Sequence, residues 1–434
     1  MTRLALKLWG AVAIAVTAFA QAPAEATTGW QPDHEVVIEW NELLQRNIPA
    51  SAGLFSFRYY AMMHIAMFDA VNSIEGGYER YHVRVPAPPV ASAEAAAARA
   101  AHDVLVALIG PNPAFDTALK KRLARLQPGR AMAGVQVGAK VAQAVIDWRT
   151  GDGTELPNIS YAPPALPGLW QPTPPTLAAA AGVLFGKVEP FALLTPTQYL
   201  PKPPPLLNSA QYANDVNQVK DLGALHNSTR TADQTLVAYL IQGVNYSPGP
   251  FAMWSQVSRE VARSQHLSLL GTARLFALVS AAMHDGLQTS HSSKYVYGLW
   301  RPITAIRRAD EDLNDQTTGD PNWEPLFSGP APAVTPPYPS HSSNVACIAW
   351  SAARTLQRIA RTDNFPFTLT WTGTGSNAGI VQQRSYGSFS ALAQEAGLAR
   401  VYAGIHFSFE LEASRESCEK VGDYVVRHYA ARKR

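Results

Sequence analysis

Long runs of helically spaced apolar residues, with no proline inside them, constrain this chain most. Residues 55–71, 91–109 and 131–148 carry apolar side chains three and four positions apart, which is the period of an amphipathic helix. Further helices are expected at 208–225, 231–243, 249–263, 267–288, 343–361, 388–403 and 407–431. Strand patterns are nearly absent apart from a short extended stretch at 367–375. The sequence therefore predicts an all-α fold of two packed helical bundles.

A proline-rich segment at 156–207 separates the two bundles. Runs such as Gln171-Pro-Thr-Pro-Pro175 exclude a regular helix or strand through most of it. Trp170, Phe185 and Phe191 indicate that the segment packs on the core instead of forming a free linker. We predict an N-terminal bundle at 21–155, the proline-rich irregular segment at 156–207 and a C-terminal oxyanion-binding bundle at 208–434.

The first residues have the pattern of an export signal. Arg3 and Lys7 accompany an apolar run at 8–19, and Ala18-Phe-Ala20 has the small-x-small form of a cleavage site. The run is shorter than the roughly 20 residues that a membrane span requires, and no later run is long and apolar enough. We predict a signal peptide at 1–20 and an exported protein, periplasmic or secreted, with no membrane span.

The net charge limits which partners this protein is expected to bind, and the two cysteines bear on the compartment in which it is expected to fold. The net charge is only +3, so no broad basic surface predicts nucleic acid as a partner, and any positive field is local. Cys347 and Cys418 can pair in an oxidising compartment. The alternative, two buried thiols that pack as small hydrophobic groups, is slightly favoured.

Two pairs of residues in the last third offer charge to a small anion. Lys294 and Arg301 lie seven apart, which is two turns of a helix continued to about residue 310, so both would leave from nearly the same face. Taken alone, the pair also fits a solvated basic face. Arg400 and His406 lie six apart, and Gly404 between them allows a bend after which His406 begins the last helix. The amides of that helix start would face the same anion.

A third segment, Pro336–Asn344, adds hydroxyl groups just before a helix. Ser340, Ser342, Ser343 and Asn344 can donate to an anion there, although a turn with an N-cap serine explains them equally well. Together the three segments supply three cations, hydroxyls and histidines, which suits a tetrahedral oxyanion such as phosphate or vanadate.

This set of motifs resembles the superfamily of vanadium-dependent haloperoxidases and type 2 phosphatidic-acid phosphatases, recognised by Lys-x6-Arg-Pro, Pro-Ser-Gly-His and Ser-Arg-x5–7-His. Lys294-x6-Arg301-Pro302 matches in full, and Arg400-x5-His406 matches with Ala399 in place of serine. The similarity extends to residues 58–72, 167–170, 267–278 and 388–407. Such coverage looks like the bacterial haloperoxidase-like branch.

The resemblance implies roles for these residues. Lys294, Arg301 and Arg400 would bind the equatorial oxygens of vanadate, or of phosphate as the alternative occupant. His406 would be the axial vanadium ligand, or the nucleophile that becomes phosphorylated in a phosphatase.

The middle motif departs from the family pattern and has two alignments. Matching Tyr338-Pro-Ser340 to Tyr-Pro-Ser places His341 at the glycine and Ser342 at the acid–base histidine. The ungapped match, which we favour, places Ser343 and Asn344 at Ser-Gly as oxyanion ligands, and Val345 at the histidine.

Two further positions bear on this site. His291 stands in place of the pocket tryptophan of the family, and Asp285 is positioned to orient an arginine. His64, His102 and His284 are expected in the core or on helix faces.

The resemblance implies an exported vanadium haloperoxidase-like oxidoreductase, in which vanadate-bound peroxide oxidises a halide or an organic substrate. His406 would hold the metal, Lys294 would polarise the peroxide, and His341 or His291 would move protons. One alternative is an acid phosphatase acting on phosphomonoesters through a phosphohistidine. The other is a non-catalytic anion-binding helical protein. A homo-oligomer is compatible with the sequence.

Overall fold

The computed structural model describes residues 33–250, 252–329 and 333–433, and helices dominate these residues. The predicted signal peptide at 1–20 lies outside them. The N-terminal helices are α1 Glu35–Asn47, α2 Ser56–Glu75, α3 Ala93–Ile109, α4 Pro113–Leu123 and α5 Pro128–Trp148. The later helices are α6 Ala210–Leu222, α7 Ala232–Gln242, α8 Met253–Ser264, α9 Leu269–Tyr297, α10 Pro302–Arg307, α11 Asn344–Ala360, α12 Phe389–Tyr402 and α13 Ser408–His428. Short 3₁₀ turns lie at 50–55, 185–187, 309–311 and 375–377.

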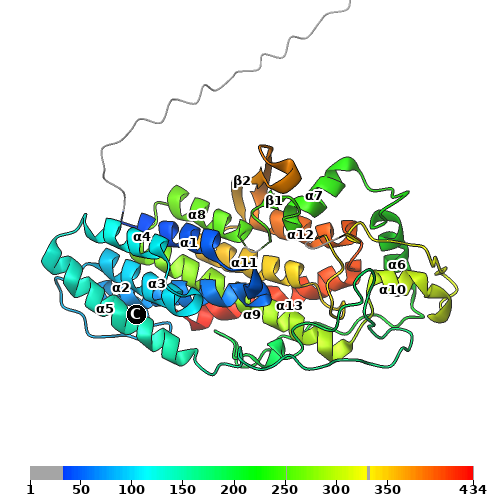
Figure 1. The fold of residues 1–434 in the computed structure, drawn as a ribbon, viewed down its shortest axis with the longest axis horizontal. Coiled ribbons are helices and arrows are strands. Elements are labelled where there is room, and N and C mark those ends of the chain that lie inside the picture. The colour runs from blue at the N-terminus through cyan, green and yellow to red at the C-terminus, as the bar shows by residue number, and fades with distance from the viewer. Residues whose placement is uncertain (1–32, 251, 330–332, 434) are drawn as a thin grey trace, which may run out of the picture. The chain divides into compact units, whose positions relative to one another are not determined.

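Helix α9 is the central element of the described fold. It packs against α2 on one side and against α11 and α13 on the other, while α3 packs against α2 and α5 (Figure 1). Nearly every side chain of α9 from Leu269 to Lys294 is buried, as expected of a helix surrounded by others. This arrangement confirms the all-α fold class. The predicted domain boundaries at 155 and 207 stay predictions.

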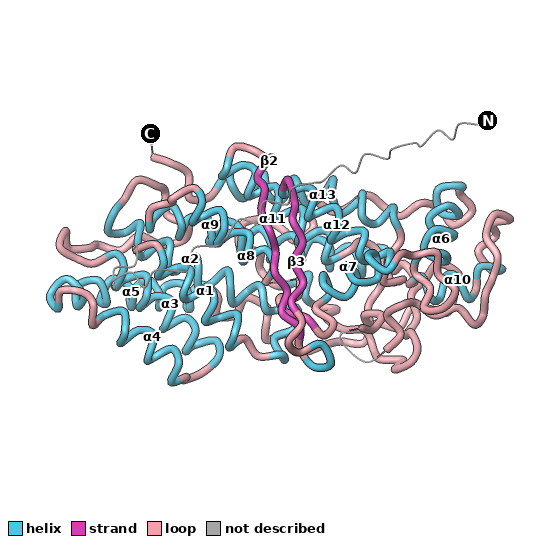
Figure 2. Tube along the Cα trace, turned by 90° about the horizontal axis from the view of Figure 1, so that it is seen from above, coloured by secondary structure: helices cyan, strands magenta, loops and turns pink. Residues whose placement is uncertain are grey.

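One small sheet interrupts the helical fold. Strands β1 Tyr246–Ser247, β2 Asn364–Gly373 and β3 Val381–Ser388 pair antiparallel in the order β1-β2-β3 (Figure 2). The extended stretch predicted at 367–375 corresponds to β2. Strand β3 was not predicted, because five of its eight residues are polar and only Tyr386 is buried, so it lacks a clear apolar alternation.

The proline-rich segment packs on the core, as predicted. Trp170, Phe185 and Phe191 are each at most 2% exposed. The amide of Trp170 donates to the carbonyl of Gly298 at 2.7 Å, which ties the segment to the end of α9. The Asp285 carboxylate accepts the amides of residues 191–193 at 2.7–2.9 Å. Asp285 therefore anchors this segment, and the expectation that it orients an arginine of the site was wrong.

The two cysteines are paired, against the slight preference for free thiols. Cys347 on α11 and Cys418 on α13 form a disulfide with a Cα–Cα distance of 5.3 Å, which is an ordinary separation for a cystine. Sequence alone did not show that the two positions face one another across adjacent helices. Within the described residues, no helix combines the length and the apolarity needed to cross a membrane.

Candidate oxyanion site

Lys294 and Arg301 come from two helices and not from one continuous helix. Helix α9 ends at Tyr297, where Gly298 has φ +61° and its amide donates to the carbonyl of Lys294. Arg301 has extended backbone, and Pro302 begins α10 at its first position. A left-handed glycine ends a helix and a first-turn proline starts one. The predicted two-turn geometry was wrong, but the chain reversal still brings both side chains together.

The ammonium of Lys294 is fully buried and faces the loop before α11. Its Nζ donates to the carbonyl of Ser340 at 2.8 Å and to that of Ser342. The ring of Tyr338 lies 5.2 Å away. Burial, with repulsion from Arg301, holds the pKa of Lys294 well below its usual value.

Arg301 links three segments of the cluster. Its Nε donates to the carbonyl of Tyr338 at 2.8 Å, and its Nη1 donates to the carbonyl of Ile405 at 2.9 Å and to Nε2 of His406 at 3.3 Å. The remaining nitrogen, Nη2, is buried and has no hydrogen-bond partner among the described residues. A buried, unpaired guanidinium N–H is costly, so this geometry calls for an acceptor.

Arg400 lies near the end of α12 and has a second unfilled donor. Its Nη1 donates to the side chain of Gln242 on α7 at 2.7 Å, while its buried Nε has no partner in the described part of the chain. Burial lowers the pKa of Arg400 to about 10, although the guanidinium stays charged at neutral pH.

His406 sits in the turn between α12 and α13, as predicted from the glycine before it. Gly404 has φ +76° there. The His406 Nδ1 is hydrogen-bonded to the carboxyl group of Glu410, one turn into α13. Because Nδ1–H donates to Glu410 and Arg301 donates to Nε2, the lone pair of Nε2 points into the cluster. Burial, with repulsion from Arg301, lowers the pKa of His406 well below its usual value.

Glu410 was not singled out from the sequence. Its carboxyl group is fully buried and also accepts the amide of Phe407 at 3.2 Å. Burial raises the pKa of Glu410 to about 7, against the opposing effect of Lys294 and Arg301. The four-residue spacing from His406 to Glu410 at a helix start was the signal that could have revealed this contact.

His341 lies beside the cluster with one free ring nitrogen. Its Nε2–H donates to the carbonyl of Lys202 at 2.7 Å, and its buried Nδ1 has no partner among the residues described. Burial lowers the pKa of His341 to about 4, and the charge of Lys294 contributes to this shift. The neutral ring therefore presents an unprotonated Nδ1.

The other predicted site residues are engaged outside the cluster. The Ser343 hydroxyl caps α11 by accepting the amide of Ala346 at 3.4 Å. The Asn344 side chain accepts from Ser290 at 3.0 Å and lies 3.3 Å from Nδ1 of His291. Their roles as oxyanion ligands stay predictions.

The remaining histidines have structural positions. His291 Nε2 donates to the carbonyl of Gly182 at 3.1 Å, and Asn344 occupies its other nitrogen, so no ring nitrogen is left for proton transfer. His64 and His284 are fully buried and His102 lies on a helix face, as predicted.

The name Lys294 cluster is used below for Lys294, Arg301, Arg400, His406 and Glu410. Within the described chain it sets three cations against one carboxylate. Nowhere in that part of the chain do three His, Cys, Asp or Glu side chains gather as they would around a metal cation. A cationic, donor-rich set with two unfilled N–H groups fits an oxyanion instead.

A hollow of about 270 Å³ lies next to His341. The carbonyl of Lys202 holds His341, and the ring of Phe409 lies 6.0 Å from the imidazole. The hollow is lined by Lys202, Pro203, Pro205, Gln211, Phe409, Glu412, Ala413 and Glu416.

Comparison with known proteins agrees with this geometry. Residues 274–433 match the family model of the VCPO second helical-bundle domain. The curated vanadium chloroperoxidase of Curvularia inaequalis is 24% identical over 288 residues, which cover 54% of this chain and 46% of that protein. The match thus spans about half of the length of this relative.

Two solved structures share the fold over nearly the whole chain. A bacterial vanadium-dependent iodoperoxidase superposes with a TM-score of 0.75 at 22% identity, covering 92% of this chain and 97% of that one. A holo-type bacterial vanadium-dependent chloroperoxidase gives 0.72 at 15% identity, covering 93% and 100%. Together these similarities show that the chain has the fold of the vanadium haloperoxidases and that its residues 274–433 resemble the second helical bundle of that family.

Proposed function

We propose that this protein is an exported haloperoxidase-like enzyme whose Lys294 cluster holds vanadate. The observation that carries the proposal is that two buried guanidinium N–H groups, on Arg301 and Arg400, are unfilled in the cluster where Nε2 of His406 has only Arg301 as a partner. Bound vanadate would supply a Lewis acid that activates peroxide toward a halide or an organic substrate. The predicted export fits the disulfide between Cys347 and Cys418, since such bonds persist in oxidising compartments.

The residues of this chain would bind and orient the oxyanion. Lys294, Arg301 and Arg400 offset its charge in a site that excludes water, where such contacts are strong. His406 would hold the vanadate through Nε2, and Glu410 fixes the tautomer in which this nitrogen carries no proton.

His341 would move the proton in place of the family histidine. Its Nδ1 is unprotonated and unfilled, and the carbonyl of Lys202 fixes the other nitrogen as a donor. Two residues that contact His341, Lys202 and Phe409, line the hollow described above. We expect His341→Gln to lower turnover about 100- to 10,000-fold with vanadate affinity retained. If His341→Gln lowered vanadate affinity as much as turnover, the result would count against an acid–base role of His341.

The proposal is tested with purified protein, orthovanadate, peroxide and bromide, using a bromination dye as the reporter. Bromination is expected with wild type and with His428→Ala, which removes an exposed histidine at the far end of α13. It is expected to vanish in His406→Ala. Bromination that persists in His406→Ala, or that wild type does not perform, contradicts the proposal.

A phosphatase is the second candidate, and the same unprotonated Nε2 of His406 supports it. Such an imidazole nitrogen beside bound oxyanion donors can attack a phosphomonoester. Vanadate-inhibited release of phosphate from a chromogenic ester, without bromination, would favour this function. Tight vanadate binding with neither reaction would leave the non-catalytic anion-binding protein.

A further inference from the structure

A second hollow, of about 400 Å³, lies at the start of α9 and the ends of α11 and α13. Its lining includes four arginines and no carboxylate: Arg274, Arg358, Arg361 and Arg432. It lies at the opposite end of α9 from Lys294 and shares no lining residue with the Lys294 cluster. The volume is in the range of small-molecule sites.

Most of this positive charge is uncompensated. Arg358 is paired with Asp423 at 2.6 Å. Arg274, Arg361 and Arg432 have no carboxylate within 4.0 Å among the described residues. Burial lowers the pKa of Arg274, and the neighbouring charge of Arg432 adds to the shift. Half-buried Arg274 and exposed Arg432 therefore repel one another without an anion between them.

The backbone holds these arginines in place. Tyr78 and Arg432 form an antiparallel bridge, and the amide of Lys433 donates to the carbonyl of Gly77 at 3.0 Å. Arg274 donates through Nε to the carbonyl of Ala430 at 2.8 Å and lies 5.0 Å from the ring of Tyr78. Residues 430–433 thus place Arg432 beside the hollow and hold Arg274 through the carbonyl of Ala430.

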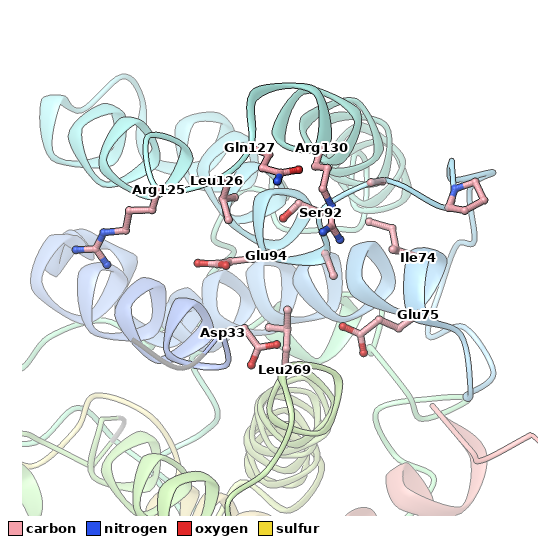
Figure 3. A pocket seen from close by; sticks show the side chains of 13 residues that line it. Asp33, Ile74, Glu75, Ser92, Glu94, Arg125, Leu126, Gln127, Arg130 and Leu269 are labelled. Carbon is pink, nitrogen blue, oxygen red and sulfur yellow. The ribbon is translucent and has the colours of Figure 1, made fainter. Parts of the chain in front are cut away.

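A hollow formed by the end of α2 and the starts of α3 and α9 has a different charge balance. It is lined by Asp33, Glu75 and Glu94 together with Arg125 and Arg130 (Figure 3). Charges of both signs lie around that hollow, so it has no excess of cations to offer an anion. The arginine-lined hollow does have that excess.

We propose that the arginine-lined hollow binds an organic anion with an apolar body, such as an aromatic or aliphatic sulfonate, phosphate or carboxylate. The guanidinium groups recognise the anionic head by charge-assisted hydrogen bonds. Half-buried Leu267, Ile359 and Val426 line the same hollow and cover the apolar part. The ring of Tyr78 and the stacked Arg274 offer a flat surface to an aromatic ligand.

Calorimetric titration of the full chain with 2-naphthalenesulfonate tests this site. Saturating orthovanadate is present throughout, so that the Lys294 cluster is occupied and the result does not depend on the proposed enzyme function. One-to-one binding is expected, about tenfold weaker in Arg274→Gln and in Arg361→Gln. Arg361→Gln is the second variant because it leaves the hydrogen bond from Arg274 to the carbonyl of Ala430 intact.

The matched control is Arg415→Gln, which removes an arginine 5.7 Å from the Trp350 ring and paired with Glu412. Binding of the sulfonate is expected to be unchanged there. Neutral 2-naphthol and inorganic sulfate are both expected to bind at least tenfold more weakly than 2-naphthalenesulfonate. Equal binding of either probe, absence of sulfonate binding, or undiminished affinity in both arginine variants would overturn the proposal.

Discussion

Two groups of buried arginines in this protein differ in how their donors are used. In the Asp152 cluster, formed by Arg58, Arg149 and Asp152, both guanidinium groups donate to the same carboxylate oxygen at 2.7 and 2.9 Å. Arg149 also donates to the carbonyls of Glu189 and Pro190. In the Lys294 cluster, Arg301 and Arg400 each retain a buried N–H without a partner in the described chain.

The contrast separates a structural cluster from a binding site. Protein groups satisfy the Asp152 cluster, which joins α2, the end of α5 and the proline-rich segment. The Lys294 cluster leaves an excess of positive charge that only a guest anion would satisfy. Burial alone therefore does not mark a functional arginine, whereas unfilled donors do.

The Asp152 cluster is expected to give the largest effect. Arg149→Met should lower the free energy of unfolding by about 3–5 kcal/mol, because two buried carbonyls lose their donor and Asp152 loses one of its two arginine partners. Urea unfolding measures this loss, with exposed Arg125→Met as the control. The affinity of the folded protein for vanadate should be unchanged. If Arg149→Met were as stable as wild type, the structural role of the Asp152 cluster would be contradicted.

Glu410 is expected to make the free energy of unfolding depend on pH. The folded pKa is about 7, against 4.5 in the unfolded chain. The folded protein therefore holds an extra proton between these values, and stability is lost as pH rises through this window. Relative to Glu410→Gln, wild type should lose about 3 kcal/mol between pH 4.5 and 7.5. Parallel unfolding curves of the two proteins measure it, and a difference independent of pH would contradict the shift.

Arg400→Met is expected to separate binding from stability. Removing a buried cation with an unfilled donor should change the stability of the ligand-free protein by less than about 1 kcal/mol. The affinity for orthovanadate should fall about 10- to 100-fold, since a hydrogen bond to a charged group is lost. Calorimetry and unfolding on the same samples measure both quantities. If Arg400→Met lost as much stability as Arg149→Met and still bound vanadate, Arg400 would be a structural arginine and not a binding residue.

Ser343→Ala is expected to have the smallest effect. Loss of the cap of α11 should cost about 1 kcal/mol of stability, with vanadate affinity unchanged, because the hydroxyl bonds the helix amide. A fall in affinity without a fall in stability would instead favour the sequence-based role of Ser343 as an oxyanion ligand.

Much of the fold follows from the sequence because its helices carry their own signals. The runs at 343–361 and 388–403 predicted α11 and α12 to within one residue at each end. The interruption of the predicted helix after Lys294 was missed, since Gly298 and Pro302 act there through backbone geometry and not through apolar periodicity. Helices α1 and α4 were also missed.

The site was only partly accessible from the sequence. Motif spacing identified the cations and His406, which the structure brings together. The contacts of Tyr338 and Gln242 depend on packing between distant segments, which no local pattern encodes, whereas the contact of Glu410 with His406 had a local signal in their four-residue spacing. The sequence also gave no reason to separate Ser343 and Asn344, which face α11 and α9, from the carbonyls of Ser340 and Ser342, which meet Lys294.

Calorimetric titration of the ligand-free wild-type protein with orthovanadate, with inorganic phosphate as the competitor, tests the central claim most directly. One oxyanion site per chain is expected, at which phosphate displaces vanadate and either anion raises the melting temperature. No heat of binding and no change in melting temperature with either anion would contradict an oxyanion site at the Lys294 cluster.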